Sequence, residues 1–197
     1  MLMMDRNFEP PRGLRTDGFE LRPIRESDAA ADYEAVMSSV AFLRDWEQSG
    51  WPEDGFTLED NRADLKQMEA RHLAMESFAY TVSDPQGGSC LGCVYLFPTD
   101  AEIFVRSKIS PRRDNDWGEF AITVYFWVRM ARLADGLDAA LLKALSVWLR
   151  AEWRIGRSLF VTSVPCQQQV EMFEKAGLSR EFRIFDPKTG GKFLAYA

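Results

Sequence analysis

The turn at residues 132–136 (RLADG) has the composition and the surroundings of an anion-binding site. It follows a β-branched and aromatic run at 121–128 (AITVYFWV), which predicts a strand buried on both faces. After the turn, apolar side chains recur at helical spacing, at Leu137, Ala140, Leu141, Ala144, Leu145 and Trp148. Free backbone N–H groups at a helix N-terminus bind anions, and a glycine lets the ligand come close. The pattern predicts a phosphate cradle, provided that the neighbouring side chains admit the ligand.

Other catalytic chemistries depend on one histidine and three cysteines. A Ser–His–Asp or Cys–His triad would need His72, which lies on the apolar face of a predicted helix and is interpreted as a packing residue. Cys90 and Cys93 have C-x-x-C spacing inside an apolar strand run, where residues three apart point to opposite faces. We therefore expect the two thiols to diverge and predict no metal site. Zinc or redox chemistry is the alternative at this pair.

The composition indicates a single globular domain, because 46% hydrophobic residues in 197 provide a sizeable core. A net charge of −6 and a pI near 5.0 argue against nucleic-acid binding, which needs clustered cations. No apolar run approaches the roughly 20 residues of a membrane span, and the apolar start at 1–4 is too short for a signal peptide. With only three cysteines, the sequence predicts a cytoplasmic protein without nucleic-acid or membrane partners.

The remaining patterns predict an α/β fold of the α+β type at residues 19–197, behind an extended or mobile lead-in at 1–18. Strands are predicted at 19–25, 78–83, 90–97, 121–128, 158–164, 180–185 and 192–196. Helices are predicted at 29–40, from a capping box at Thr57 and Asp60 to about Met75, from Leu137 onward, and at 167–175. A loop at 46–56 and a charged segment at 99–118, with a short strand near 103–105, complete the chain. This order predicts one central mixed sheet.

Three segments resemble the GNAT superfamily of acetyl-CoA-dependent N-acetyltransferases, in an order that covers residues 19–197. They are LRPIRESDAAADY at 21–33, WVRMARLADGLDAALLKAL at 127–145 and QVEMFEKAGL at 169–178. The resemblance implies a central mixed, mostly antiparallel sheet flanked by helices. It also implies acetyl-CoA as a co-substrate, no metal, and direct transfer of an acetyl group to an amine.

The resemblance further implies where the co-substrate would bind. Pantetheine would lie along Trp127, Val128 and Arg129. Pyrophosphate would lie at Ala134, Asp135, Gly136, Leu137, Asp138 and Ala139. Cys166 stands where an asparagine of the family often contacts the cofactor.

The family's phosphate loop has the pattern Gln/Arg-x-x-Gly-x-Gly/Ala, which falls on Leu133, Gly136 and Asp138, so only the glycine matches. The Asp138 carboxylate suits the dipole of a helix N-terminus that holds no anion, but it would repel a pyrophosphate, as would Asp135. Arg129 and Arg132 would compensate if they turned toward the phosphates.

The catalytic positions of the family are also altered. The glutamate that some members carry on the central strand falls on Ile122 or Thr123, so Glu119 is the candidate base if the strand entry bends toward the cleft. The tyrosine that returns a proton to the thiolate falls on Phe173. Tyr125 is then a candidate for a distant acid, with a core or cleft-lining aromatic as the alternative. Direct transfer tolerates such losses, since proximity supplies much of its acceleration.

Two functions remain open from the sequence. An N-acetyltransferase would take a small-molecule or peptide amine from a cleft beside the 46–56 loop, and the acidic residues at 114–119 would suit a cationic amine. A catalytically degenerate protein of the same fold would act as an acyl-CoA sensor or an interaction module. Trp46, Trp51 and Trp117 would then form an exposed interaction patch, with a cover over the core as the alternative for each of them. In either case, an edge strand near the C-terminal hairpin offers a homodimer contact.

Overall fold

The computed structural model describes residues 9–86, 88–112 and 114–197, so residues 1–8 of the predicted lead-in lie outside the described residues. The strands are β1 (Leu14–Arg15), β2 (Glu20–Pro23), β3 (Phe78–Ser83), β4 (Cys90–Pro98), β5 (Lys108–Pro111), β6 (Ile122–Val128), β7 (Ser158–Ser163), β8 (Arg180–Phe185) and β9 (Lys192–Tyr196). The α-helices are α1 (Ala29–Met37), α2 (Val40–Glu47), α3 (Leu58–Leu73), α4 (Glu102–Val105), α5 (Leu137–Ala151) and α6 (Gln167–Lys175). Short 3₁₀ turns lie at Glu26–Asp28, Trp117–Glu119 and Met130–Arg132. None of the described helices has the length and apolar content needed to cross a membrane.

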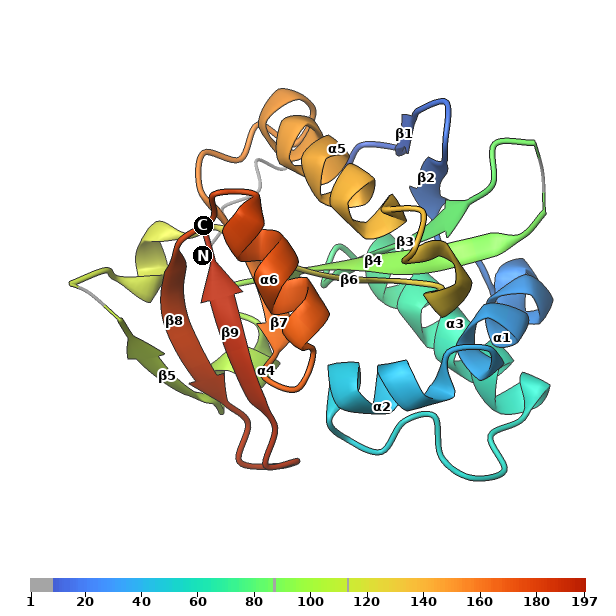
Figure 1. Ribbon diagram of the computed structural model, residues 1–197, viewed down its shortest axis with the longest axis horizontal. Coiled ribbons are helices and arrows are strands. Elements are labelled where there is room, and N and C mark those ends of the chain that lie inside the picture. The colour runs from blue at the N-terminus through green and yellow to red at the C-terminus, as the bar shows by residue number, and fades with distance from the viewer. Residues whose placement is uncertain (1–8, 87, 113) are drawn as a thin grey trace.

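The described strands form one sheet in the order β1-β2-β3-β4-β6-β7-β9-β8-β5 (Figure 1). Only β6 and β7 run parallel, and every other neighbouring pair is antiparallel. The predicted α+β fold with a central mixed, mostly antiparallel sheet is therefore confirmed. Four elements, β3, β8, β9 and α6, have the bounds that the sequence predicted.

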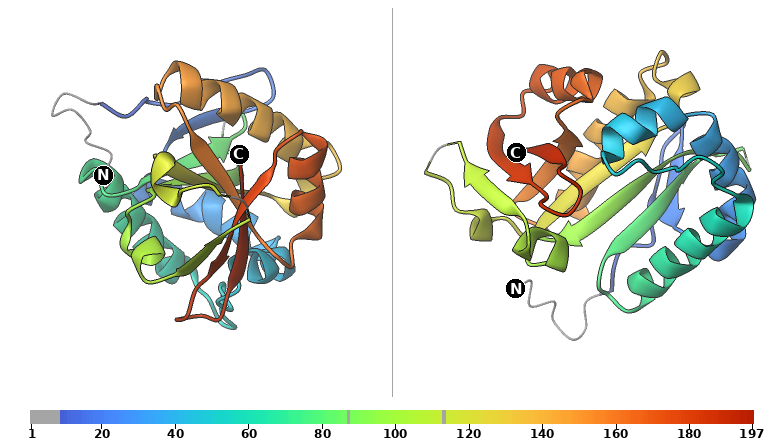
Figure 2. Two further views of the ribbon diagram at one scale, coloured as in Figure 1. Left: turned by 90° about the vertical axis from the view of Figure 1, so that its left-hand side faces the viewer. Right: turned by 90° about the horizontal axis from the view of Figure 1, so that it is seen from below.

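Helices cover both faces of the sheet, and Figure 2 shows α5 and α3 on opposite sides of it. On one face, the apolar sides of α5 and α6 pack against Val124 and Phe126 of β6. On the other face, apolar residues of α1, α2 and α3 pack around Trp127 of the same strand. Because side chains alternate along a strand, β6 contributes to both cores, which explains its continuous apolar sequence.

Three elements differ from the sequence prediction. Helix α2 replaces the start of the predicted loop, and Leu43 and Trp46, three residues apart, bury its inner side. Helix α4 and strand β5 replace the short strand expected near 103–105, and β5 is an edge strand whose mostly exposed side chains show no apolar alternation. Strand β1 lies inside the predicted lead-in and pairs with β2, so the sheet begins before residue 19.

Two local predictions on α3 are confirmed. The Thr57 hydroxyl oxygen accepts a hydrogen bond from the Asp60 N–H, and the Asp60 carboxylate accepts one from the Thr57 N–H, which is the predicted capping box. His72 is buried, its Nδ1 lies 3.1 Å from the Ala79 carbonyl oxygen, and its ring packs against Phe78. Burial lowers the pKa of His72, so the imidazole is a neutral packing residue, as the sequence indicated.

The prediction that Cys90 and Cys93 point to opposite faces is wrong. Two consecutive residues of β3 face Gly92 and Cys90, which leaves Leu91 as an extra residue in β4. This β-bulge shifts the alternation of side chains by one position, so both thiols lie on the same face. Their Sγ atoms lie 3.6 Å and 3.2 Å from Oδ1 of Asp32 in α1.

Candidate functional site

Strands β6 and β7 pair over only three residues and then separate. Residues 122–124 of β6 face residues 158–160 of β7, whereas residues 125–128 of β6 have no partner in β7. The Arg129 N–H donates to the Leu91 carbonyl on the β4 side, so the alternation directs the backbone groups of Phe126 and Val128 toward β7. Donors and acceptors on such a freed edge can bind an extended ligand as they would bind another strand.

Gln169, in the first turn of α6, connects the two separating strands. Its Nε2 donates to the Phe126 carbonyl of β6 at 3.0 Å, and its Oε1 accepts from the Thr162 hydroxyl of β7 at 2.6 Å. The Gln169 residue is only 5% exposed. One buried amide therefore satisfies a polar group on each strand and fixes how far apart they stand.

Replacing Gln169 by leucine is expected to destabilise the protein by about 1–3 kcal/mol, because the Thr162 hydroxyl and the Phe126 carbonyl would lose a buried partner. The midpoint of denaturant unfolding measures this change. Gln167→Leu is the matched control, since Gln167 is exposed and its Nε2 donates to the Val164 carbonyl at the surface. Equal midpoints for the two variants would show that the bridge contributes no stability.

The turn before α5 has the backbone geometry of an anion site. Gly136 has a φ of 70°, in the left-handed region that favours glycine, and no atom lies within 4 Å of where a Cβ would stand. The N–H groups of Leu133 and Gly136 bind carbonyls inside the turn. The N–H groups of residues 137–139 begin α5 and have no carbonyl partner within the helix. These are the donors that a phosphate would use.

Asp138 places a negative charge at this same helix end. The residue is 8% exposed, and its Oδ1 accepts a hydrogen bond from the Ala139 N–H at 2.8 Å. A carboxylate here stabilises the N-terminus of α5 through the helix dipole. It also occupies one of the donors available to a phosphate, so it competes with an anionic ligand.

Both arginines of the loop are held by other side chains. Arg129 lies 2.8 Å from the Glu34 carboxylate of α1, and its Nε donates to the Ser38 hydroxyl. Arg132 lies 2.8 Å from the carboxylate of Asp135. The compensation that the sequence led us to expect from these two cations is therefore not present in this structure.

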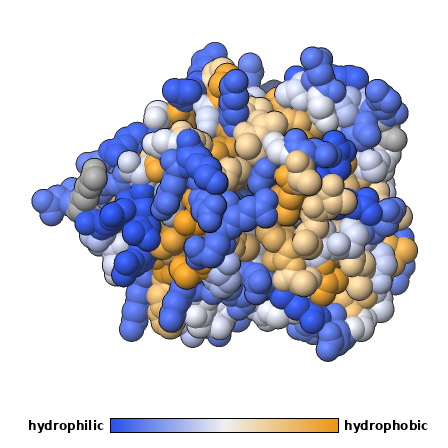
Figure 3. Space-filling model, in the orientation of Figure 1, coloured by the Kyte–Doolittle hydropathy of each residue, from blue (hydrophilic) through white to orange (hydrophobic). Residues whose placement is uncertain are grey.

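Three large hydrophobic side chains are exposed near the ends of the separating strands. Met130 follows β6 and is 46% exposed, Val164 follows β7 and is 37% exposed, and Met37 ends α1 and is 41% exposed. The Met130 N–H donates to the Ser39 hydroxyl, which brings the end of α1 against the end of β6. Figure 3 shows hydrophobic surface gathered between α6 and α2 on this face of the molecule. An exposed apolar border of this kind is typical of a binding surface.

The structure does not bring together the two catalytic candidates from the sequence. Glu119 precedes β6, is exposed, and forms an ion pair with Arg157, which precedes β7. It therefore lies at the end where the strands are paired, away from their separation. Tyr125 is the first residue of β6 beyond the paired region, and its ring packs edge-on against Trp46 and Phe193.

A carboxyl that the sequence analysis missed lies on the same side of the sheet as Tyr125. Glu47 is the last residue of α2 and follows Trp46, whose ring contacts Tyr125. Its Oε2 is buried and has no hydrogen-bond partner among the described residues. Burial raises the pKa of Glu47 to about 7, with a contribution from the charge of Asp186 and against a hydrogen bond from the Ser49 backbone. Such a carboxyl takes up and releases a proton near neutral pH, which a general base must do.

Three residues expected to contact the co-substrate have buried side chains. The Trp127 indole N–H donates to the Tyr95 hydroxyl at 3.3 Å, and Val128 packs in the core under α5. Cys166, at the N-cap of α6, is 6% exposed, and burial raises the pKa of its thiol to about 11. A thiol that stays protonated at neutral pH is a poor nucleophile. Val128 therefore offers a ligand its backbone groups, whereas the backbone groups of Trp127 face β4. Ala134 and Ala139 are exposed on the loop and the helix.

No protein-family model matches the sequence, and no curated protein does. Several solved structures match closely in shape. The ribosomal-protein-S5-alanine acetyltransferase from Vibrio fischeri is 15% identical, covers 93% of this chain and 94% of its own, and superposes with a TM-score of 0.67. RimL, a ribosomal L7/L12 alpha-N-protein acetyltransferase in complex with coenzyme A, is 15% identical over 92% and 93% of the two chains, with a TM-score of 0.67. A GNAT-family acetyltransferase from Bacillus anthracis is 14% identical over 93% and 96%, with a TM-score of 0.61.

The chain has the GNAT fold. This confirms the fold that the three sequence segments indicated. Within the GNAT fold, the position that the sequence analysis assigned to the proton-donating tyrosine is Phe173, which is fully buried against Phe126, Phe160 and Tyr196. A phenyl ring has no proton to donate, so α6 supplies no acid at this place.

Of the two alternatives for Trp46, Trp51 and Trp117, the structure shows rings that cover apolar residues and not an exposed patch. Trp46 is 7% exposed and belongs to the core between α2 and the sheet. Trp117 is half-buried, donates to the Thr99 carbonyl and packs against the β8 side of the sheet. Trp51 packs edge-on against Phe56. Large aromatic rings in these loops cover apolar residues that would otherwise face water.

Proposed function

We propose that this protein is an acetyl-CoA-dependent N-acetyltransferase that moves an acetyl group directly to an amine. The observation that carries the proposal is the Glu47 carboxyl, whose buried Oε2 has no hydrogen-bond partner among the described residues. It lies on the side of the sheet where β6 parts from β7 beyond Val124, and burial raises its pKa to about 7. The exposed apolar border of Met37, Met130 and Val164 supports it. The comparison with acetyltransferases of the same fold supports it further, as an analogy.

The described residues fit coenzyme A along most of its length. The Phe126 N–H and the backbone groups of Val128 would hold pantetheine at the freed β6 edge, since the Phe126 carbonyl is bound by Gln169. The N–H groups of 137–139 would hold the phosphates beside Gly136. Asp138 is the one group that opposes this fit. When bound, acetyl-CoA supplies a thioester whose carbonyl carbon is open to attack by an amine.

Glu47 has the role of general base in this proposal. It takes the proton of the acceptor ammonium and holds it at Oε2, which has no other hydrogen-bond partner among the described residues. The charge of Glu47 favours a cationic acceptor, whereas Asp186 is paired with Arg106. Burial raises the pKa of Tyr125, so its hydroxyl stays protonated and is available as a hydrogen-bond donor on this face.

The acceptor in this proposal is an amine of a small molecule or a peptide. The acetyltransferases from Vibrio fischeri and RimL, whose structures this chain resembles, act on ribosomal proteins, which supports a polypeptide amine. The apolar border of Met37, Met130 and Val164 would contact the chain that carries the amine. The proposal includes no nucleic-acid or membrane partner. It assumes that the protein acts in the cytoplasm.

The affinity for coenzyme A is expected to rise about 3- to 30-fold in Asp138→Asn, because the substitution removes a like charge from the phosphate site and keeps the shape of the side chain. Calorimetric titration of acetyl-CoA and CoA into the wild type and the variant measures this. Glu152→Gln is the control, since Glu152 is an exposed acidic residue at the opposite end of α5. Absence of binding in all three proteins would contradict the proposed function.

The second candidate is a catalytically degenerate GNAT-fold protein that senses acyl-CoA. It is favoured by Asp138 at the α5 N-terminus and by Phe173 in place of an acid. The two candidates differ in product formation. A protein that binds acetyl-CoA but acetylates no member of a panel of polyamines, aminoglycosides and peptides, at any pH between 6 and 9, would be a sensor.

A further inference from the structure

Asp32 of α1 and Cys90 and Cys93 of β4 form a buried cluster that the proposed reaction does not use. Their exposed fractions are 3%, 2% and 1%. One carboxylate oxygen and the two sulfur atoms all lie within 4.8 Å of one another. Cys166, the remaining cysteine, is also buried but lies outside the cluster.

Gly92 turns both thiols to the same face. It has a φ of +149°, and a Cβ at this position would stand 2.1 Å from the Trp127 carbonyl oxygen of the neighbouring strand. Only glycine fits so close to a backbone atom, so the approach of β4 to β6 requires a glycine at the residue next to the bulge at Leu91. The convergence of Cys90 and Cys93 is therefore built into the backbone.

The Asp32 carboxylate has no cationic partner among the residues that the structure describes. It accepts hydrogen bonds from the amide of Asn61 and from the two thiols. The nearby guanidinium of Arg22 is bound by both oxygens of Asp28, at 2.6 Å and 2.8 Å. Burial raises the pKa of Asp32, because a buried carboxylate needs either a proton or a cation to balance its charge.

The spacing of the three groups matches tetrahedral coordination. Typical zinc bond lengths of about 2.3 Å to sulfur and about 2.1 Å to oxygen imply a sulfur–oxygen separation of roughly 3.6 Å in a tetrahedral site. The two thiols lie 3.2 Å and 3.6 Å from Oδ1 of Asp32. An ion would therefore require only small side-chain movements.

Asn61 of α3 orients the carboxylate toward the thiols. Its Nδ2 donates to Oδ2 of Asp32 at 3.0 Å and to the Ala29 carbonyl at 3.1 Å, which leaves Oδ1 for the sulfur side. Asn61 is fully buried, and its own Oδ1 has no partner among the described residues. Polar groups that hold a ligand in this way commonly accompany metal sites.

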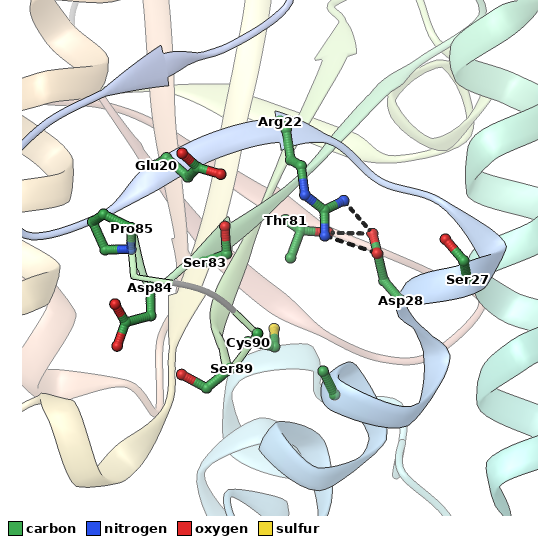
Figure 4. A pocket seen from close by; sticks show the side chains of 12 residues that line it. Glu20, Arg22, Ser27, Asp28, Thr81, Ser83, Asp84, Pro85, Ser89 and Cys90 are labelled. Atoms are coloured by element: carbon green, nitrogen blue, oxygen red, sulfur yellow. Dashed lines mark hydrogen bonds and ion pairs between the residues drawn. The ribbon is translucent and has the colours of Figure 1, made fainter.

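A polar pocket gives access to the cluster. It has a volume of about 310 Å³ and is lined by residues of β2, β3, the β3–β4 hairpin and the turn before α1. Figure 4 shows Cys90 among the lining side chains, with Arg22 and Thr81 both bonded to Asp28. Cys90 is the member of the cluster that lines this pocket, so an ion and a water ligand would enter the site from here.

We propose that Asp32, Cys90 and Cys93 bind one divalent transition-metal ion, with zinc as the best match, and that a water from the pocket completes the site. Two thiolates and one carboxylate suit zinc, and three protein ligands with one open position are a common arrangement for it. The site is separate from the proposed acetyl transfer. It ties α1 to β4 and so stabilises the face of the sheet that holds Glu47.

Binding must release protons, because only the thiolates coordinate the metal. Both thiols are hydrogen-bond donors in the metal-free protein, and the hydrogen bond with Cys90, followed by burial, raises the pKa of Cys93. Because each thiol donates its proton in a hydrogen bond, each ion displaces two thiol protons, and a third if Asp32 is protonated. No oxidant or reductant takes part.

The test uses the reduced, metal-free full chain under nitrogen. Cobalt(II) is titrated first, because thiolate coordination gives a charge-transfer band, and zinc is then added to displace it in competition with a chromophoric chelator. We expect one equivalent per chain and a thermal unfolding temperature that rises with zinc. Calorimetry in buffers of different protonation enthalpy counts the protons released. Failure of zinc to bind, or binding without the charge-transfer band, overturns the proposal.

Substitutions assign the ligands. Cys93→Ser and Asp32→Asn are each expected to weaken zinc binding more than about 100-fold, and Asn61→Ala about 10- to 100-fold. Cys166→Ser removes an equally buried thiol outside the cluster and should bind zinc as the wild type does. Asp32→Asn keeps the side-chain volume and removes a buried charge, so it tests the site in a chain that folds. Equal zinc affinity for Asp32→Asn, Cys93→Ser and Cys166→Ser would overturn the assignment.

Discussion

The Glu47→Gln variant is expected to lose about 10²- to 10⁴-fold in kcat while it binds acetyl-CoA as tightly as the wild type. Glutamine keeps the shape of the side chain at the end of α2 but cannot accept a proton from the acceptor amine. Steady-state rates with the best acceptor from the amine panel measure the loss, and calorimetric titration measures the affinity. A loss of kcat without a loss of affinity separates proton transfer from binding of the co-substrate.

The pH dependence of the rate follows from the pKa of Glu47, which burial raises to about 7. A base must be deprotonated to act, so the wild-type kcat is expected to rise with pH through about 7 and then level off. Glu47→Gln should lack this rise. A wild-type profile that is flat between pH 5.5 and 8.5 would rule out Glu47 as the base.

The same pKa acts on stability in the opposite direction. The folded-state pKa of Glu47 lies above its value of 4.5 in an unfolded chain, so the folded protein holds this proton more tightly. The stabilisation is complete below about pH 4.5 and is lost as the pH rises through 7. Glutamine stays neutral, so Glu47→Gln should gain stability relative to the wild type above pH 7. We expect a gain on the order of 1–2 kcal/mol after allowance for partial exposure.

Glu53→Gln is the control for both measurements, because Glu53 lies in the loop that follows α2 and is exposed. It should change neither kcat nor the pH dependence of unfolding. If Glu53→Gln and Glu47→Gln behave alike, the burial of Glu47 has no functional meaning.

The sequence was sufficient to predict the first and last residues of those elements whose side chains alternate between water and the core. Helix α6 and strands β8 and β9 begin and end where the pattern of apolar residues does, and Gly177 ends α6 at a φ of 84°. Strand β5 was not predicted because its side chains are mostly exposed and give no apolar pattern. Backbone pairing with β8 holds it in the sheet. Helix α2 was not predicted because it is short. Its two turns contain only two buried side chains, Leu43 and Trp46, which are too few to show a helical period.

The candidate site was less accessible from the sequence, because its chemistry depends on distances between segments far apart in the chain. Glu47 stands out only through burial and the charge of Asp186, which lies more than a hundred residues later. Arg129 and Arg132 were expected near the phosphates, but Glu34 and Asp135 bind them. A single-sequence pattern contains no information on which partner a charged side chain will choose.

The relative position of Cys90 and Cys93 could not be predicted from the sequence either, although the two residues are close in the chain. The period of a regular strand placed Cys90 and Cys93 on opposite faces, and one extra residue, Leu91, reversed that conclusion. The signal was Gly92 inside an otherwise apolar run, since a glycine in a strand often marks a bulge or a close backbone approach. Both apply here.

Gly92→Ala is expected to destabilise the protein by about 3–5 kcal/mol, the largest stability effect predicted for any single substitution in this chain. The new methyl group would stand 2.1 Å from the Trp127 carbonyl oxygen and 2.8 Å from the Val128 Cα, and both are backbone atoms that cannot turn aside. The φ of +149° adds strain for any residue with a Cβ. Denaturant unfolding monitored by tryptophan fluorescence measures the loss.

Gly88→Ala separates the clash from the backbone strain. Gly88 lies in the hairpin between β3 and β4 with a φ of +110°, but no atom lies within 4 Å of its Cβ position, so alanine there should cost only about 1–2 kcal/mol. Relief of the Gly92 clash requires β4 to shift at the residue beside the Leu91 bulge, and we expect this shift to separate Cys90 from Cys93. Gly92→Ala should therefore also lose the cobalt charge-transfer band, whereas Gly88→Ala should keep it. Retention of the band in a folded Gly92→Ala protein would show that the bulge is not what brings the thiols together.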